Sequence, residues 1–214
     1  MKSITRQKPI EEIEQMLEGL ERAFIVGCGT CATMTKTGGR DEVLQMKETL
    51  QGLGKMVTGW TVVPTACDDM SEATLNENSA AIQSAECLLA MSCALGVQKL
   101  SSLNGKPVIP ALDTLFIGVE DGPGNFHEVC DQCGRCLLGY TAGICPITAC
   151  HKGLLNGPCG GTNNGKCEID KDKDCAWTLI YNRLKEQGRL DLMRKYQPVR
   201  NSQVVPRPRM AHIS

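Results

Sequence analysis

Hydrophobic and polar positions follow two alternating periods along the first 110 residues. Apolar side chains at Ile10, Ile13, Leu17 and Leu20 recur at helical spacing, and short apolar runs such as "AFIVG" are typical of buried strands. Glycines near the end of the segment 39–54 are consistent with the end of a second helix. The pattern predicts helices over residues 9–23, 39–54, 71–85 and 94–103, and strands over residues 23–27, 56–64, 86–93 and 107–111.

Strands that alternate with helices indicate βαβ units and a parallel sheet. We therefore expect an α/β fold whose N-terminal domain, residues 1–125, is a Rossmann-like parallel sheet with helices. The breaker-rich stretch "EDGPGN" at residues 120–125 marks the expected boundary. A small loop-rich, cysteine-rich domain should follow over residues 126–197, and then an extended C-terminal arm over residues 198–214, where Pro198, Pro206 and Pro208 oppose helix.

Composition excludes several classes of partner. A net charge of −1 over 214 residues, with 4% aromatic residues, argues against nucleic acid. Apolar runs of about 20 residues, the length that a membrane helix needs, are absent from the sequence, so no membrane span is expected. Residues 1–16 lack the apolar stretch of a signal peptide, and we expect a cytoplasmic location, where disulfides rarely persist.

Thirteen cysteines are therefore unusual for this chain. An isolated cysteine such as Cys87 is most simply a small buried hydrophobic residue. Eight of the thirteen, however, fall within the 46 residues from Cys130 to Cys175. Thiols at that density in a reducing compartment favour metal ligation.

Four cysteines of the N-terminal domain follow three successive predicted strands. Cys28 and Cys31 follow the first, Cys67 the second and Cys93 the third. Ligand sites of open α/β sheets lie at the carboxyl ends of the strands, so a cluster or metal site here competes with the alternative of buried thiols. "GCGTCA" also fits the dinucleotide fingerprint, but Asp68 and Asp69 lie about twice too far along the chain for the acidic residue that this motif needs.

The second group of cysteines carries a more specific spacing. "CDQCGRC" is a C-x2-C-x2-C run, typical of bacterial ferredoxins, where a Cys-Pro provides a further ligand. By that analogy its three thiols share a cluster with a distant fourth cysteine. Two [4Fe–4S] clusters are favoured over one cluster plus a zinc ion, because zinc ribbons show paired C-x2-C units. The eight candidate ligands are Cys130, Cys133, Cys136, Cys145, Cys150, Cys159, Cys167 and Cys175.

The segment from "CDQCGRC" to "DCAW", which contains "NGPCGG" and "KCE", resembles the cysteine-rich domain of the methylenetetrahydrofolate reductase C-terminal family. That family includes the small iron–sulfur subunit, the MetV type, of the two-subunit reductase of acetogenic bacteria. The pieces "VGCGTCATMTKTGG", "ACDD" and "SCALGVQ" also resemble that subunit, so the resemblance extends from about residue 8 to residue 200. The family's flavin-binding barrel is absent from these 214 residues.

The resemblance implies an electron-transfer subunit rather than a catalytic one. It implies that an electron donor protein or complex reduces the chain. The cysteine spacing predicts two [4Fe–4S] clusters in the C-terminal half, and whether there is a third in the N-terminal domain stays open. FMN or FAD is expected on a (β/α)8-barrel partner that reduces methylenetetrahydrofolate to methyltetrahydrofolate. Two alternatives stay open: a structural or regulatory zinc-binding subunit of the same kind of complex, and a self-contained pyridine-nucleotide oxidoreductase.

The loop "NGPCGG" is read through the resemblance as a cluster-binding loop. Gly157, Gly160 and Gly161 can adopt positive φ and wrap a thiolate closely. His151 and Lys152 adjoin Cys150, and the simplest expectation for both is a solvated surface side chain.

Overall fold

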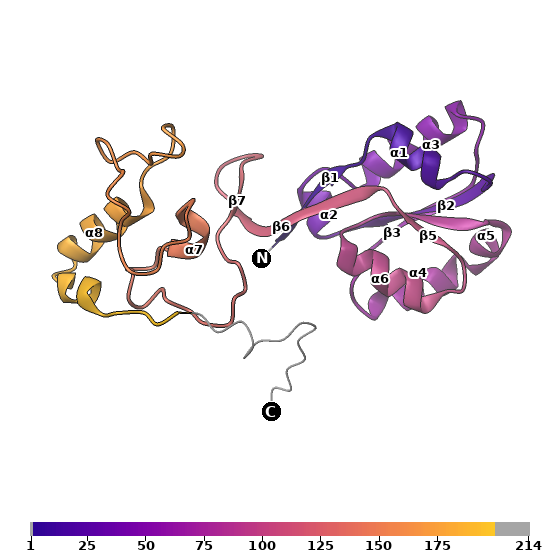
Figure 1. The fold of residues 1–214 in the computed structure, drawn as a ribbon. Helices are drawn as coiled ribbons and strands as arrows, with labels where there is room; N and C mark the ends of the chain where they lie inside the picture. The colour runs from indigo at the N-terminus through magenta and orange to yellow at the C-terminus, as the bar shows by residue number, and fades with distance from the viewer. Residues whose placement is uncertain (1, 200–214) are drawn as a thin grey trace. The chain divides into compact units, whose positions relative to one another are not determined.

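The computed structural model describes residues 2–199. The chain divides into two compact units, residues 1–127 and 128–214, which are described separately below. The first unit has the expected α/β fold, with helices around a parallel sheet (Figure 1). In the part of the chain that the structure describes, every helix is too short or too polar to cross a membrane.

A four-stranded parallel sheet forms the centre of the first unit. Its strand order is β3-β2-β4-β5, and both neighbours of β2 run parallel to it. The order reverses between β2 and β4, which is the position where open α/β sheets bind ligands. The strands are β2 (Arg22–Cys28), β3 (Met56–Val63), β4 (Cys87–Met91) and β5 (Val108–Pro110).

Helices cover both faces of this sheet because its central strands are apolar on both sides. Phe24 and Val26 of β2 pack with Leu75, Ile82 and Leu100 on one face. The other face packs against apolar side chains of α1 and α3. Figure 1 shows these two helices together on one side of the sheet. The helices are α1 (Ile10–Met16), α2 (Cys31–Met34), α3 (Arg40–Gly52), α4 (Met70–Glu77), α5 (Ser79–Ser84) and α6 (Ala94–Leu103).

A second, smaller sheet has the order β1-β6-β7, and its strands were not predicted. They are β1 (Lys2–Gln7), β6 (Leu112–Glu120) and β7 (Phe126–Glu128). β1 pairs antiparallel with β6, although the two are separated by more than a hundred residues. β1 gives little apolar signal because Ser3 and Thr5 are buried beside Ile4, so its buried positions are mostly hydroxyl-bearing. The stretch "EDGPGN" is the turn between β6 and β7.

The second unit is mostly loop. Its helices are α7 (Pro146–Ala149), α8 (Ala176–Glu186) and the 3₁₀ helix η1 (Leu190–Arg194). Its buried core consists of Trp177, Ile180, Leu184 and Leu192, all from α8 and η1. Between residues 128 and 175, all of which the structure describes, no large aliphatic or aromatic side chain is fully buried.

Two expectations about helix boundaries needed revision. The helix predicted over residues 9–23 is shorter, because α1 ends at Met16 and β2 already begins at Arg22. The helix predicted over residues 71–85 is two helices, α4 and α5, which meet at Asn78. Asn78 has φ −102° and ψ 13°, and its side chain donates to the carbonyl of Thr74, so it ends one helix and precedes the next. The four strands of the parallel sheet occupy the predicted segments.

Gly38 should be essential to the first unit. A Cβ atom at this position would collide with the carbonyl oxygen of Met91 at the end of β4, so Gly38→Ala must move backbone. We expect a loss of about 1–3 kcal/mol in the free energy of unfolding, measured by denaturant titration. Gly52→Ala is the matched control, because a Cβ there meets nothing within 4 Å and alanine favours helix by about 0.5–1 kcal/mol. Equal stability of the two variants would contradict this reading.

Candidate metal centre

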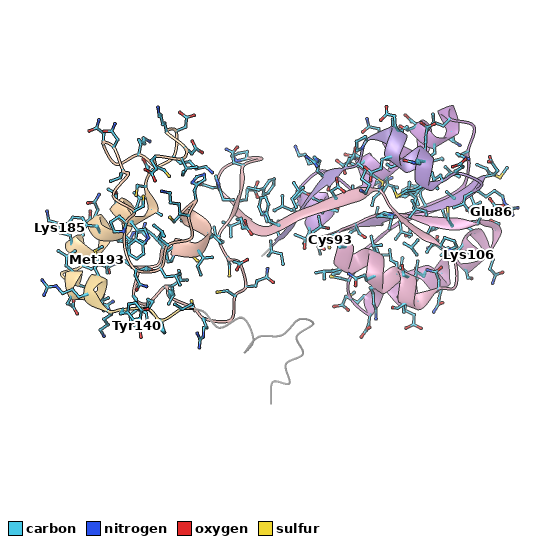
Figure 2. The ribbon with its side chains drawn as sticks, viewed as in Figure 1. Glu86, Cys93, Lys106, Tyr140, Lys185 and Met193 are labelled. Atoms are coloured by element: carbon cyan, nitrogen blue, oxygen red, sulfur yellow. The ribbon has the colours of Figure 1, made fainter. Side chains whose placement is uncertain are left out.

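The N-terminal cysteines lie where three neighbouring strands end. Cys28 is the last residue of β2, and Cys31 begins α2 three residues later. Cys67 lies in the loop after β3, and Cys93 precedes α6 after β4. Figure 2 shows Cys93 at one end of the four-stranded sheet, opposite the end where Glu86 and Lys106 lie. Cys28 and Cys93 therefore flank the switch point between β2 and β4.

The pKa of Cys67 indicates that the four thiols lie near one another. Burial raises the pKa of the Cys67 thiol, and the negative charges of Cys93, Cys28 and Cys31 raise it further. Cys67 is exposed as a residue, so the effect reflects partial desolvation of its sulfur together with three like-charged neighbours. The four thiols from three separate segments thus lie within electrostatic reach of one another.

Polar groups of the surrounding loops hold the Cys28–Cys31 turn. The backbone N–H of Ala66 donates to Cys28 Sγ at 3.5 Å, and Thr30 Oγ1 lies 3.3 Å from the same sulfur. Thr33 Oγ1 donates to the carbonyl of Cys28 at 2.7 Å. Donors aimed at a cysteine sulfur stabilise its thiolate form, which is the form that ligates iron or zinc.

A second group of thiols surrounds one cavity of the second unit. The cavity is lined by four cysteines together with Trp177, Pro158, Lys152 and Glu168. These four come from separate turns of the chain, spread over 26 residues. They are Cys150, Cys159, Cys167 and Cys175.

Close turns between residues 157 and 175 bring these cysteines together. The N–H of Cys175 donates to the carbonyl of Gly165 at 2.7 Å, and the N–H of Cys167 donates to the carbonyl of Lys173 at 3.0 Å. Gly157 and Gly160 have the positive φ expected of the "NGPCGG" loop, at 115° and 82°.

Gly161 does not have a positive φ. A Cβ there would meet only the flexible end of the Glu168 side chain, so steric crowding does not require glycine at this position. The N–H of Gly161 donates to Cys159 Sγ at 3.4 Å, so the loop places a backbone donor on a cavity thiol.

Cys175 occupies the N-cap position of α8. Burial alone would raise the pKa of its thiol, but hydrogen bonds from Thr178, from the backbone of Trp177 and from the hydroxyl of Thr162 outweigh that effect and lower the pKa. The helix dipole also favours negative charge at this end of α8. Thr178 and Trp177 belong to α8, so the helix that provides most of the core of this unit also helps to lower the pKa of the Cys175 thiol.

Two polar side chains near the cavity, those of His151 and Lys152, were expected to be ordinary surface residues. His151 Nδ1 lies 3.8 Å from Cys167 Sγ, and Nε2 of the same ring lies 3.7 Å from Asp170. Lys152 forms an ion pair with Glu168, whose carboxylate lies 3.5 Å from Cys159 Sγ. The adjacency of His151 and Lys152 to Cys150 was the available sequence signal, whereas the approach of Glu168 depends on the 162–175 turns.

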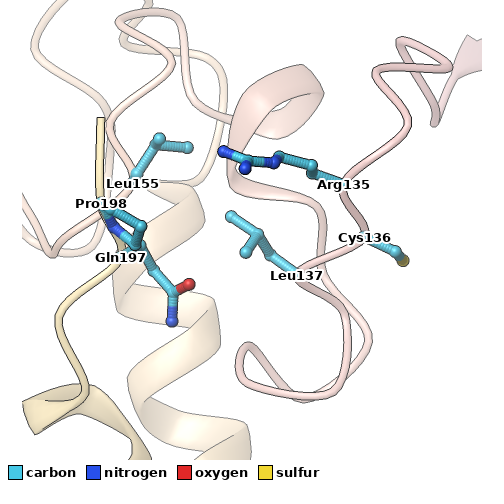
Figure 3. Close-up of a pocket in the computed structure, with 6 residues that line it drawn as sticks. All are labelled: Arg135, Cys136, Leu137, Leu155, Gln197 and Pro198. Carbon is cyan, nitrogen blue, oxygen red and sulfur yellow. The ribbon is translucent and has the colours of Figure 1, made fainter. Parts of the chain in front are cut away.

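The other four cysteines of this unit lie outside that cavity. The N–H of Gln132 donates to Cys130 Sγ at 3.4 Å, and Cys133 Sγ lies 3.6 Å from the carbonyl of Arg135. Cys145 is the N-cap of α7, with Pro146 as its first residue. In Figure 3 the side chain of Cys136 points away from a neighbouring pocket, into which Arg135 and Leu137 project.

The donor sets are thiols, which ligate zinc and iron–sulfur clusters alike. Over residues 2–199, no three His, Cys, Asp or Glu side chains converge closely enough to hold one metal ion. Four thiols around one cavity, four at one sheet edge and N–H donors to sulfur on both units fit cluster ligation chemically. Cys87 is different, because burial in the apolar core raises its pKa to about 11.

Comparison with known proteins gives one match. Residues 109–203 match a family model described as "Methylene-tetrahydrofolate reductase C terminal". This comparison supports a relation to methylenetetrahydrofolate reductases. The matched residues include all eight cysteines of the second unit and make up less than half of the 214-residue chain. No curated protein and no solved structure matches the chain.

The predicted C-terminal arm, residues 198–214, lies almost wholly outside the described residues. The residue just before the arm is hydrogen-bonded to one of the cysteine-rich loops. Asn156 Nδ2 donates to the carbonyl of Gln197 at 2.9 Å, and the N–H of Gln197 donates to Asn156 Oδ1 at 2.6 Å. Asn156 precedes "GPCGG", so the same loop that carries Cys159 anchors the chain just before the arm.

Metal removal should open residues 128–175 and leave the first unit folded. If the thiols of that segment hold metal as the sequence predicts, ligation would supply much of the free energy that orders it, because the segment contributes no large, fully buried apolar side chain. We expect anaerobic chelation under reducing conditions to expose this segment to limited proteolysis, with cleavage sites read by mass spectrometry. A metal-free chain in which residues 128–175 stay protected would contradict the prediction.

If the four-thiol cavity holds a [4Fe–4S] cluster, Cys167→Ala should remove that cluster without disturbing the other sites. Because Cys167 lines the four-thiol cavity, its loss should lower the iron content by about four atoms per chain. The matched control is Cys87→Ala, which removes a thiol from the apolar core and should leave the iron unchanged. Equal iron loss in both variants, or in neither, would refute the grouping.

Proposed function

We propose that this chain is the electron-transfer subunit of a methylenetetrahydrofolate reductase complex. The observation that carries the proposal is the gathering of Cys150, Cys159, Cys167 and Cys175 around one cavity, within the segment that matches the reductase family. [4Fe–4S] clusters held by such thiolates accept and release single electrons.

Three clusters account for twelve of the thirteen cysteines. The cavity set would hold one of them. Cys130, Cys133 and Cys136 would hold a second, and we assign Cys145 as its fourth ligand because the other four cysteines of the unit line the cavity. Cys28, Cys31, Cys67 and Cys93 would hold the third, at the carboxyl edge of the sheet. Cys87 is left as a core residue.

The protein's own groups would set how readily each site accepts an electron. Backbone N–H groups that donate to the sulfurs of Cys28, Cys130 and Cys159 would stabilise the negative charge added on reduction and so raise the reduction potential. Beside the cavity, the carboxylate of Glu168 has the opposite effect, and its ion pair with Lys152 offsets it. The polypeptide thus tunes the potential through hydrogen bonding, burial and local charge.

The chemistry of folate reduction would belong to a partner. The family's flavin, FMN or FAD, sits on a (β/α)8-barrel catalytic subunit, and single electrons from this chain would reduce that flavin in two steps. The reduced flavin would then convert methylenetetrahydrofolate to methyltetrahydrofolate. A separate electron donor protein or complex would reduce this chain.

Anaerobically purified chain should contain about twelve irons and a matching amount of acid-labile sulfide. Reduction should produce EPR signals of [4Fe–4S] clusters, and mixing the reduced chain with the barrel flavoprotein should bleach the flavin absorbance in stopped flow. Cys167→Ala should slow that bleaching, whereas Cys87→Ala should not. Zinc in place of iron would instead support a structural or regulatory subunit, and NADH binding by the isolated chain would support a pyridine-nucleotide enzyme.

A further inference from the structure

Two threonines face each other across the small sheet of the first unit. Thr5 of β1 and Thr114 of β6 are direct partners in the antiparallel ladder. Each reaches a different segment that bears one of the N-terminal cysteines. Thr5 contacts the segment that follows Cys31, and Thr114 contacts the residue that follows Cys93.

Thr5 acts through two further threonines. Its Oγ1 lies 2.6 Å from Thr37 Oγ1 and 3.1 Å from Thr35 Oγ1. Thr35 Oγ1 donates to the carbonyl of Cys31 at 3.0 Å, and Thr37 Oγ1 donates to the carbonyl of Ala32 at 3.3 Å. Because each hydroxyl has one proton, the O–H of Thr5 then donates to one of these two hydroxyls, and the shorter distance of 2.6 Å favours Thr37.

Burial prevents water from replacing the hydrogen bonds of this hydroxyl network. Thr5 is 5% exposed and Thr37 is 9% exposed, so water has little access to complete their hydrogen bonds. Gln7 of the same strand adds a further bond, from its Nε2 to the carbonyl of Thr37 at 3.1 Å. A buried hydroxyl that lost its partner would carry a desolvation cost, so the network fixes the turn at Cys31 relative to β1.

Thr114 holds the other segment with a single bond. Its Oγ1 accepts from the N–H of Ala94 at 2.8 Å. Ala94 is the first residue of α6, and Cys93 is the N-cap. The bond therefore fixes the backbone one residue beyond the Cys93 thiol.

The pairing of β1 with β6 sets the distance between the Thr5 contact and the Thr114 contact. Side chains directly opposite each other in an antiparallel pair have Cβ atoms about 4.5–5.5 Å apart. The backbone hydrogen bonds of β1 and β6 hold that separation, whereas the cysteines themselves lie on loops and helix starts. The pair thus links the Cys31 turn and the Cys93 turn through a strand ladder that bears no cysteine, at the point where the register shifts between Ile4 and Thr5.

We infer that Thr5 and Thr114 are positioning residues, which hold the Cys31 and Cys93 segments at the separation that an iron–sulfur cluster on Cys28, Cys31, Cys67 and Cys93 requires. The inference rests on the proposed function, because it concerns the third proposed cluster. It adds to that proposal a role for β1 and β6, whose residues would contact the ligating segments without ligating iron.

The test uses the full chain, purified anaerobically, with valine and serine variants at both positions. Thr5→Val and Thr114→Val keep the side-chain shape and remove the hydroxyl, whereas Thr5→Ser and Thr114→Ser retain it. Thr58→Val is the matched control, because Thr58 is a strand threonine that bonds the carbonyl of Ala23 and lies on β3 away from Cys67. The signal of the N-terminal cluster is identified as the iron and EPR signal lost in Cys31→Ala.

We expect both valine variants to lose this cluster to a chelator faster, by roughly the 10–100-fold that loss of outer-shell partners costs metal sites, and to shift its EPR spectrum and midpoint potential. The serine variants should restore wild-type behaviour, and Thr58→Val should match wild type. Circular dichroism checks that each variant is folded, and a variant that is unfolded is judged by its serine counterpart alone, which must retain the cluster.

Two results would overturn the inference, and they are distinguishable. If Cys31→Ala lowers the iron content but both valine variants keep the wild-type potential, spectrum and chelation rate, the threonines do not position the site and the proposed cluster stands. If Cys31→Ala leaves the iron content and EPR spectrum unchanged, the third cluster itself is refuted, and the positioning role is refuted with it.

Discussion

Four cysteines brought to one place can ionise together only at a cost in free energy, and this cost is the constraint on which both proposed sites depend. It is indicated at Cys67, where burial and the neighbouring Cys93, Cys28 and Cys31 raise the pKa of the thiol. A positively charged centre shared by the four sulfurs would offset the cost. Until such a centre is bound, the surrounding fold holds together the segments that carry the thiols.

The two units meet this constraint in different ways. In the first, a parallel sheet with helices on both faces fixes the ends of β2, β3 and β4, and the cysteine segments follow from those ends. In the second, close turns bring Cys150, Cys159, Cys167 and Cys175 around one cavity, and among the residues that the structure describes the buried apolar core comes from α8 and η1. The first unit is a scaffold that a cluster would join, whereas order in the second would depend on its metal.

The sequence predicted the parallel sheet because its strands are short, apolar on both faces and separated by helices of regular period. It did not predict β1 or β6, because pairing between strands more than a hundred residues apart leaves no local pattern. The cysteines were found from their density and spacing. Their grouping in the second unit could not be predicted, because it depends on the turns between Gly157 and Cys175. The approach of His151 to Cys167 depends on the same turns.

The pairing of β1 with β6 also has a consequence for the order of events during synthesis. A growing chain contains all four N-terminal cysteines once residue 93 has been added, but β6 ends only at Glu120. Until then, β1 lacks the partner strand that carries Thr114, and the start of α6 lacks its bond to that threonine. Long-range strand pairing is slow compared with local helix formation. Nascent chains would therefore contain every N-terminal thiol before the geometry that arranges them is complete, which places closure of that site after the first unit has been made.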